Sequence, residues 1–230
     1  QGGKRVKVDK AEWDESRGFD GDHAFNVAWI AGCARVLKPS GTLWASGTQH
    51  VIFSIGFALQ SAGWKILNVV TWYKVNAAPN LACRTMTHST ELVLWAAPPA
   101  AAAEGKLLHT YNYREMKAEN GGKQLRDVWA VREDGSADGG VKWELPAAAG
   151  DEKREGRHPT QKPIALLDRI VRASSKPGDL VLDPFNGAGT TGLVATRLQR
   201  RYVGIELNPE YVAMSERRIR SDAPLFLGVA

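Results

Sequence analysis

The chain has few cysteines and no long apolar run. Its 230 residues include only Cys33 and Cys83. Two thiols are too few for a disulfide-stapled secreted scaffold or for a multi-cysteine zinc site. No apolar run approaches the ~18 residues of a membrane-spanning helix, and residues 1–5 lack the apolar core of a signal peptide. These absences predict a cytoplasmic protein that has no metal site and does not bind membranes.

Composition and charge favour an ordinary globular protein of one large or two small domains. The apolar fraction is 43%, which is enough to bury a sizeable core. The formal net charge is +5 and the pI is about 9.2. This positive excess is compatible with a polyanionic partner such as DNA, and equally with a generically basic protein.

Alternating helical and strand patterns predict an α/β fold. The region 22–38 reads as a helix with Phe25, Trp29 and Cys33 on its apolar face. Short turns between helices and strands predict a parallel or mixed sheet covered on both faces. The other expected helices span 51–62, 163–174, 190–198 and 209–220, and the expected strands span 42–46, 64–73, 91–95, 179–182 and 202–205.

Two regions lack such patterns. Residues 96–103 form a low-complexity connector rich in alanine and proline. Residues 121–157 show little periodicity and are too long for a plain loop in a compact domain. We therefore expect the second region to be functional or mobile.

The most informative stretch is residues 183–191, Asp-Pro-Phe-Asn-Gly-Ala-Gly-Thr-Thr. A strand precedes it, Gly187 and Gly189 form a tight turn, and a helix follows. The next strand ends on Glu206. Strand, glycine turn, helix, strand and acid is the order found around nucleotide-type cofactors in doubly wound sheets, where the acid accepts hydrogen bonds from ribose hydroxyls.

The departure from the dinucleotide fingerprint narrows the choice of cofactor. The third glycine is absent, and Asp183 places at the strand end a carboxylate that would repel a pyrophosphate. A phosphate-free cofactor with a positive centre and an amino-acid tail suits this position better, and S-adenosylmethionine has both features. Two alternatives are an NAD-linked oxidoreductase and a purely structural turn in which Thr190 or Thr191 caps a helix.

These motifs together resemble those of a known family. Residues 157–163, Arg-His-Pro-Thr-Gln-Lys-Pro, followed by a helix and the 183–191 motif, are similar to the paired cofactor motifs of the β-class DNA amino-methyltransferases of restriction-modification systems. In that class the motif order is circularly permuted, so that the catalytic motif comes first and the cofactor motifs last. Residues 38–44, residues 72–76 with 79–80, and residues 88–91 look like the intermediate motifs, and the resemblance covers nearly the whole chain.

The resemblance implies a Rossmann-like methyltransferase fold with a mostly parallel, doubly wound sheet and helices on both faces. It divides the chain into a catalytic-side half at 1–105, a candidate target-recognition region at 106–157 and a cofactor-binding half at 158–230. The implied enzyme transfers a methyl group from S-adenosylmethionine, directly and in line, to the exocyclic amine of a flipped base, with adenine N6 favoured over cytosine N4. The implied partners are double-stranded DNA, a second copy in a homodimer and a cognate restriction endonuclease.

One motif of the family is absent. The catalytic tetrapeptide Asp-Pro-Pro-Tyr or Ser-Pro-Pro-Tyr, or its Trp and Phe versions, occurs nowhere in the sequence. Residues 183–185 are not a substitute, because they belong to the cofactor motif. We expect the tetrapeptide to precede Gln1 in the natural protein, so no catalytic residue is assigned. The alternative is a non-catalytic DNA-binding subunit that retains a cofactor pocket.

The resemblance and residue chemistry together assign roles in cofactor binding. Asp183 pairs with the methionine amino group, Phe185 lines the pocket and Glu206 holds the ribose diol. Thr190 and Thr191 meet the methionine carboxylate at a helix N-terminus. The complete set of expected cofactor contacts is Thr160, Gln161, Lys162, Asp183, Phe185, Gly187, Gly189, Thr190, Thr191, Glu206 and Asn208.

Two segments are expected to face DNA. The polar loop after the strand 64–73 lies at the edge where open α/β sheets bind their ligands. The basic side chains of 106–157 suit phosphates, which position a duplex without specifying its sequence. The expected DNA contacts are Lys74, Asn76, Asn80, Arg84, His88, Lys123 and Arg126.

Overall fold

The computed structural model describes residues 15–74, 77, 79–103, 106–129, 150–156 and 158–222. All of the expected helices and strands are present. Six further short elements, η2, β4, β5, α3, β6 and η3, are formed in regions where no element was expected. The elements are α1 (Gly18–Val36), β1 (Leu43–Gly47), α2 (Ile52–Ser61), β2 (Lys65–Tyr73), β3 (Thr90–Ala97), η2 (Pro99–Ala101), β4 (Ala102–Ala103), β5 (Lys106–Leu107), α3 (Tyr113–Glu119), β6 (Val128–Trp129), η3 (Gly150–Lys153), α4 (Ile164–Ser174), β7 (Leu180–Asp183), α5 (Thr190–Arg197), β8 (Arg201–Gly204) and α6 (Pro209–Asp222).

Four strands form the larger sheet, in the order β1, β3, β2, β6. β3 runs antiparallel to both β1 and β2, and the short β6 runs parallel to the end of β2. β2 and β3 follow one another without a crossover helix, which is why they pair antiparallel. β7 and β8 form a separate parallel pair. The α/β class is confirmed, but the pairing of the described strands is mixed rather than mostly parallel.

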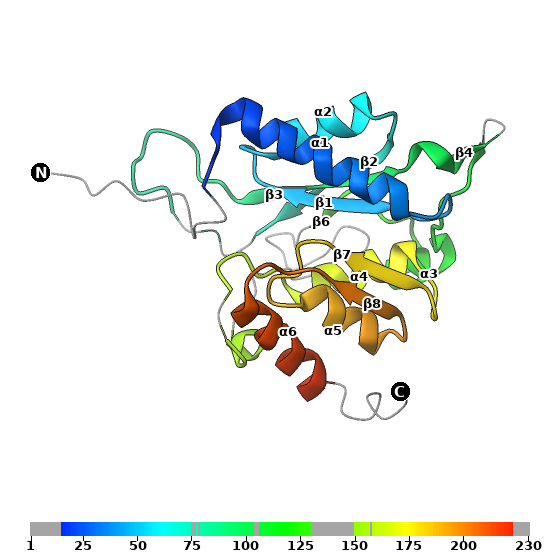
Figure 1. The fold of residues 1–230 in the computed structure, drawn as a ribbon. Coiled ribbons are helices and arrows are strands. Elements are labelled where there is room, and N and C mark those ends of the chain that lie inside the picture. Colours follow the sequence, from blue (N-terminus) through cyan, green and yellow to red (C-terminus); the bar gives the residue numbers. More distant parts are fainter. Residues whose placement is uncertain are drawn as a thin grey trace, which may run out of the picture.

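Helices cover the larger sheet on both faces. Figure 1 shows α1 and α2 on one side of it and α4 on the other. Strand β3 explains this arrangement, since its successive side chains point to opposite faces. Leu94 packs with Ile30 of α1, whereas Val93 packs with Leu166 of α4. The sheet is therefore doubly covered, as the sequence predicted.

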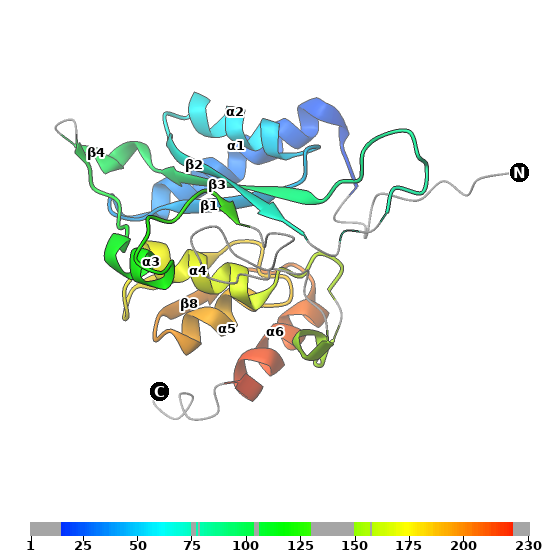
Figure 2. The ribbon, with the colours of Figure 1, turned by 180° about the vertical axis from the view of Figure 1, so that it is seen from behind.

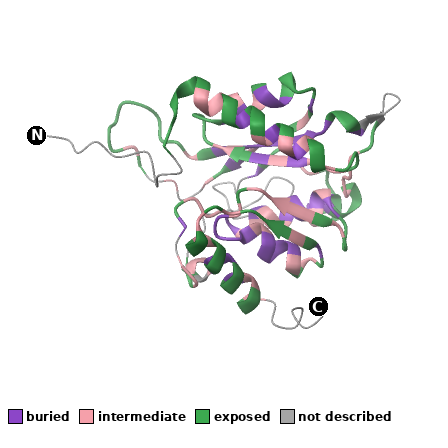
Figure 3. Ribbon diagram, in the orientation of Figure 1, coloured by how far each residue is buried: buried purple, intermediate pink, exposed green. Residues whose placement is uncertain are grey.

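Helix α4 joins the two halves of the fold. Leu166 and Ile170 face the larger sheet, whereas Val171 packs against Leu193 and Val194 of α5. Viewed from behind, α4 lies between the sheet and α5 (Figure 2). Figure 3 shows a mostly exposed α6 at one side of this layer. Among the described residues, no helix combines the length and the apolarity needed to cross a bilayer.

Candidate functional site

The ends of two neighbouring parallel strands bring the predicted acids to one edge of the molecule. β7 ends on Asp183, which is in register with Gly204 of β8. Glu206 lies two residues beyond the end of β8. The carboxyl ends of parallel strands are where α/β folds bind ligands. The structure therefore places the two carboxylates as the sequence pattern predicted.

Both oxygens of Asp183 contribute to the shape of the turn. Oδ1 accepts the backbone N–H of Phe185 at 3.0 Å, and Oδ2 accepts the hydroxyl of Thr191 at 2.6 Å. The carboxylate therefore joins the strand tip to the first turn of α5. Each oxygen retains a further lone pair that can accept from a ligand.

Glu206 is held by two backbone donors. Its Oε2 accepts the N–H of Gly187 at 2.8 Å, and its Oε1 accepts the N–H of Asn208 at 2.8 Å. These bonds fix the carboxylate beside the glycine turn. The side chain of Asn208 accepts the N–H of Glu210 at 2.9 Å, so this residue also has a structural role at the start of α6.

Backbone conformation favours glycine at both positions of the turn, and protein packing adds to this, most strongly at Gly189. Gly187 and Gly189 have φ values of +51° and +71°, a region that favours glycine. A Cβ on Gly187 would lie 3.1 Å from Nε2 of His158, and one on Gly189 would lie 2.0 Å from Oγ of Ser215. Both glycines also belong to the expected cofactor contacts. The structure adds a tight approach by His158 and by α6.

Thr190 and Thr191 follow the turn but differ in their surroundings. The Thr190 side chain is buried, and its Oγ1 accepts Nη1 of Arg218 at 3.1 Å. That guanidinium also donates to the carbonyl of Ala188. Thr190 therefore links the turn to Arg218 of α6 on the buried side. Thr191 is only partly buried, and its hydroxyl donates to Asp183.

His158 packs against the glycine turn and was not assigned a role from the sequence. The ring is buried and lies edge-on to Tyr211, with 4.4 Å between ring centroids. Its Nδ1 accepts the backbone N–H of Thr160 at 3.3 Å. Burial lowers the pKa of His158, although the nearby Glu206 carboxylate opposes the shift. The imidazole is therefore neutral at neutral pH, with Nδ1 as an acceptor.

The three expected cofactor contacts before α4 already have protein partners. Gln161 Nε2 donates to the carbonyl of Glu152 at 2.7 Å, and the Thr160 hydroxyl lies 3.3 Å from Nδ1 of His158. Nζ of Lys162 lies 3.1 Å from Oε2 of Glu91 at the start of β3. The structure thus brings the 158–163 segment against both the glycine turn and the larger sheet.

Aromatic side chains of α1 meet the cofactor motif. Phe185 is about half exposed, and its ring lies 5.9 Å from that of Phe25 and 5.7 Å from that of Trp29, centroid to centroid. Cys33 is buried in the core as expected, but Phe25 is exposed. The helical stripe identified in the sequence therefore serves two purposes: its later residues pack in the core, and Phe25 and Trp29 contact the turn.

The expected DNA contacts before β3 form a loop with internal order. Lys74 pairs with Glu91, and the amide of Asn80 donates to the backbone oxygen of Thr85 at 2.7 Å. His88 lies 3.3 Å from the amide nitrogen of Gln49. Arg84 is exposed, as is the neighbouring Cys83, whose φ is +52°. Asn76 lies outside the described residues.

The other two expected DNA contacts lie on a separate segment. Lys123 and Arg126 are exposed between α3 and β6. α3 docks on the second half of α4, where Arg169 pairs with Glu119 at 3.0 Å. The 160–162 residues instead precede the first turn of α4. These two basic residues lie on the segment that leads from α3 into β6, whose Trp129 packs with Leu166 of α4.

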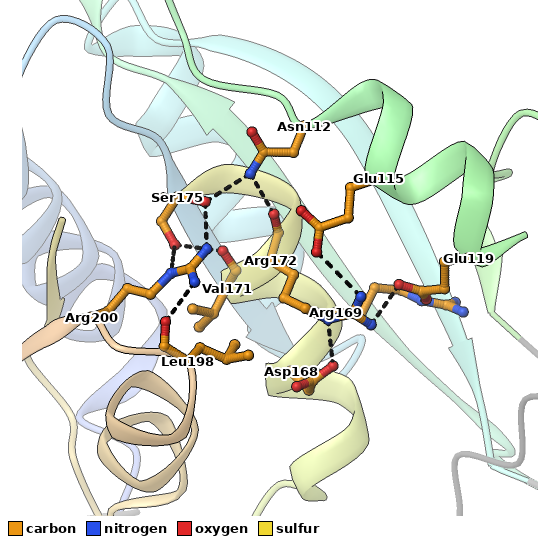
Figure 4. Close-up of polar contacts among 10 residues, drawn as sticks. All are labelled: Asn112, Glu115, Glu119, Asp168, Arg169, Val171, Arg172, Ser175, Leu198 and Arg200. Atoms are coloured by element: carbon orange, nitrogen blue, oxygen red, sulfur yellow. Dashed lines mark hydrogen bonds and ion pairs between the residues drawn. The ribbon is translucent and has the colours of Figure 1, made fainter. Parts of the chain in front are cut away.

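A polar network fastens α3 to the cofactor half (Figure 4). The Asn112 amide donates to the carbonyls of Arg172 and Ser175, both at 2.7 Å. Arg200 donates to the same Ser175 carbonyl, also at 2.7 Å. These carbonyls end α4 and have no partners within the helix. The start of the 106–157 region is therefore held against the end of α4. The division of the chain into 1–105, 106–157 and 158–230 stays a prediction.

The polar groups at the strand tips fit a nucleoside with a charged amino-acid tail. Asp183 offers negative charge to an ammonium group, Glu206 offers acceptors to a diol, and the N-terminus of α5 suits a carboxylate. Phe185 gives an exposed aromatic surface beside them. Within the described part of the chain, no group of three or more His, Cys, Asp or Glu residues is arranged to hold a metal ion.

Comparison with known proteins gives one consistent result. The family described as DNA methylase, of the N6 and N4 type, matches residues 3–217. The chain is 48% identical over 221 residues to the type II methyltransferase M2.DpnII of Streptococcus pneumoniae, covering 96% of this chain and 76% of that protein.

Solved structures agree with the sequence comparison. The crystal structure of the M1.HpyAVI complex with SAM is similar with a TM-score of 0.64 and 30% identity, covering 84% of this chain and 81% of that one. The PvuII cytosine-N4-specific DNA methyltransferase has a TM-score of 0.65 at 20% identity, covering 96% and 76%. The second likeness supports the Rossmann-like fold alone.

Proposed function

The chain belongs to the family of N6-adenine and N4-cytosine DNA methylases, and from this premise we propose that it methylates adenine N6 in double-stranded DNA. It is a DNA amino-methyltransferase of the restriction-modification type, and S-adenosylmethionine is its cofactor. Cytosine N4 is the alternative acceptor, because both are exocyclic amines conjugated to a ring. The relative described as cytosine-specific is only 20% identical, which gives no reason to prefer cytosine.

We assign the grip on the cofactor to the two strand-tip acids. Asp183 would pair with the methionine ammonium, and Glu206, already fixed by two backbone N–H groups, would accept from the ribose hydroxyls. Phe185 would line the pocket. The observation that carries the proposal is this pair of carboxylates at adjacent parallel strand ends, with the glycine turn between them.

The main contribution of the protein to methyl transfer is to position the two reactants. Bound S-adenosylmethionine supplies an electrophilic methyl group on a sulfonium. The base amine is a weak nucleophile, since its lone pair is delocalised into the ring. Acceptors for the amine N–H groups would draw the nitrogen toward a tetrahedral state. The sequence contains no Asp-Pro-Pro-Tyr-type tetrapeptide to supply them, so we assign that step to no residue here. Holding the reactants in line contributes at most about 7–11 kcal/mol.

DNA binding is assigned to the polar loop between β2 and β3 and to the basic segment after α3. Arg84 and His88 are exposed on the first, and Lys123 and Arg126 on the second. Their charges suit phosphates. Because the target amine is inaccessible inside a duplex, we propose that the base leaves the stack before transfer. We also propose a homodimer that acts in the cytoplasm beside a cognate restriction endonuclease.

The test is transfer of tritium from labelled S-adenosylmethionine to unmethylated genomic DNA by the full-length protein. Digestion of the product to nucleosides and mass spectrometry would then identify the base. Recovery of N6-methyladenine is expected, and it should disappear in Asp183→Asn. N4-methylcytosine would overturn the assignment of the base. Cofactor binding without any transfer would favour a non-catalytic subunit.

A further inference from the structure

One buried carboxylate connects the DNA-facing loop to the cofactor segment. Glu91, the second residue of β3, has a side chain only 10% exposed. It is paired with Nζ of Lys74 at one oxygen and with Nζ of Lys162 at the other, the latter at 3.1 Å. The two lysines come from opposite parts of the sequence and share this single acid.

Several observations distinguish this triad from an exposed surface ion pair. The side chains of Lys74 and Lys162 are only 23% and 28% exposed. Burial alone would raise the pKa of Glu91, but the attraction of Lys162 and Lys74 outweighs it, and the pKa is lowered. The acid is therefore ionised at neutral pH. Removing its charge would leave two partly buried ammonium groups facing each other.

On one side, the triad closes the base of the loop that carries expected DNA contacts. The N–H of Lys74 donates to the carbonyl of Ser89 at 2.7 Å, directly before β3. Together with the Lys74–Glu91 pair, this bond defines where residues 79–89 leave the sheet. A movement of that loop when a DNA duplex binds would therefore displace the Lys74 side chain that pairs with Glu91.

On the other side, the triad leads to the cofactor turn. Lys162 belongs to the same short segment as His158, whose ring packs on Gly187. The N–H of Gly187 in turn is held by Glu206. A continuous series of contacts therefore runs from the loop base through Glu91 to the acid assigned to the ribose.

We propose that Glu91 is a positioning residue that makes the binding of cofactor and the binding of DNA cooperative. The inference deepens the proposed function and rests on it. In this arrangement, Lys162 acts on the cofactor through the position of its segment rather than by the direct contact expected from the sequence. Cofactor binding would order the 158–163 segment and thereby fix Glu91 and the base of the loop. DNA binding to the loop would in turn fix Glu91 and the 158–163 segment.

The experiment measures S-adenosylhomocysteine affinity by calorimetry, with and without a saturating unmethylated DNA duplex that contains the site at which the protein transfers its methyl group. In the wild-type protein, DNA should tighten the affinity at least about 5-fold, and in Glu91→Gln the factor should fall toward 1. The matched control is Glu216→Gln, which removes an exposed helix pair with Arg220 at 3.6 Å and should keep the wild-type factor.

A second variant keeps the test decisive if Glu91→Gln does not fold. Lys162→Met leaves the Lys74–Glu91 pair in place and should also lose the coupling, and the combined variant should lose no more than either single one. Wild-type coupling in Glu91→Gln or in Lys162→Met would overturn the inference, as would two ligands that bind the wild type independently. Failure of the wild type to bind S-adenosylhomocysteine at all would instead refute the proposed function.

Discussion

Replacing Gly189 by alanine should destabilise the fold through one identifiable contact. The residue has φ +71°, and the added Cβ would lie 2.0 Å from Oγ and 2.7 Å from Cβ of Ser215. A left-handed conformation costs a non-glycine residue about 1–2 kcal/mol, and overpacking adds about 1–3 kcal/mol. We therefore expect Gly189→Ala to lower the free energy of unfolding by about 2–5 kcal/mol.

Gly178 provides a control that isolates the backbone term. Its φ is +83°, and a Cβ there would meet nothing within 4 Å. Gly178→Ala should therefore cost only the conformational term, about 1–2 kcal/mol. For a chain of this size, 1 kcal/mol corresponds to a shift of about 2–4 °C in Tm, so the two variants are separable by calorimetry.

Combining Gly189→Ala with Ser215→Gly tests the contact itself. Removing the serine side chain should recover part of the loss, although the Cα of residue 215 would still lie 3.0 Å from the new Cβ. Thermal and urea unfolding of the two single variants and the double variant give the coupling energy. The reasoning fails if Gly189→Ala costs no more than Gly178→Ala, or if the two changes are simply additive.

Three further predictions concern charged groups. Glu206→Gln should weaken S-adenosylhomocysteine binding by about 10-fold to 100-fold in calorimetry, since charge-assisted bonds contribute about 1.5–3 kcal/mol. Arg169→Met should lower the free energy of unfolding in urea by about 3–5 kcal/mol, because it breaks a buried ion pair with Glu119. Arg197→Met, at a more exposed ion pair with Asp222, should lower it by at most about 1 kcal/mol. Equal losses of stability in the two variants would contradict this reasoning. Because burial lowers the pKa of His158 from 6.5, its contribution to stability is complete above pH 6.5 and is lost as the pH falls through the lowered value. His158→Gln should therefore flatten the fall of Tm between pH 7 and pH 5.

The elements around the glycine turn were predictable because local chemistry determines them. β7, α5 and β8 follow from an apolar run, two glycines and a helical pattern, and each was found within about two residues of its expected bounds. The elements that were missed are all short, and α3 and β6 are two of them. The first has seven residues and the second two, and neither carries a long periodic pattern. Tertiary contacts hold both, since Arg169 pairs with Glu119 of α3 and lies over the ring of Trp129 in β6.

The site was predictable only in part, for a related reason. The position of Asp183 and Glu206 beside the glycine turn could be predicted because the carboxyl ends of paired parallel strands converge. The pairing of Glu91 could not be predicted, because it depends on a lysine 71 positions later, Lys162. One signal was available: an acid at the start of a strand whose following residues are apolar and buried is costly unless it is paired. Phe25 likewise fitted a core stripe, and only the fold shows that it reaches Phe185.

The contrast between the two cysteines has a practical consequence. Cys83 is exposed on the loop between β2 and β3, whereas Cys33 is enclosed in the core and burial raises the pKa of its thiol. A thiol-reactive fluorophore would therefore label the native protein on that loop alone, without any cysteine replacement. The emission of such a dye, measured with and without a DNA duplex, would test the proposed binding of DNA to this loop.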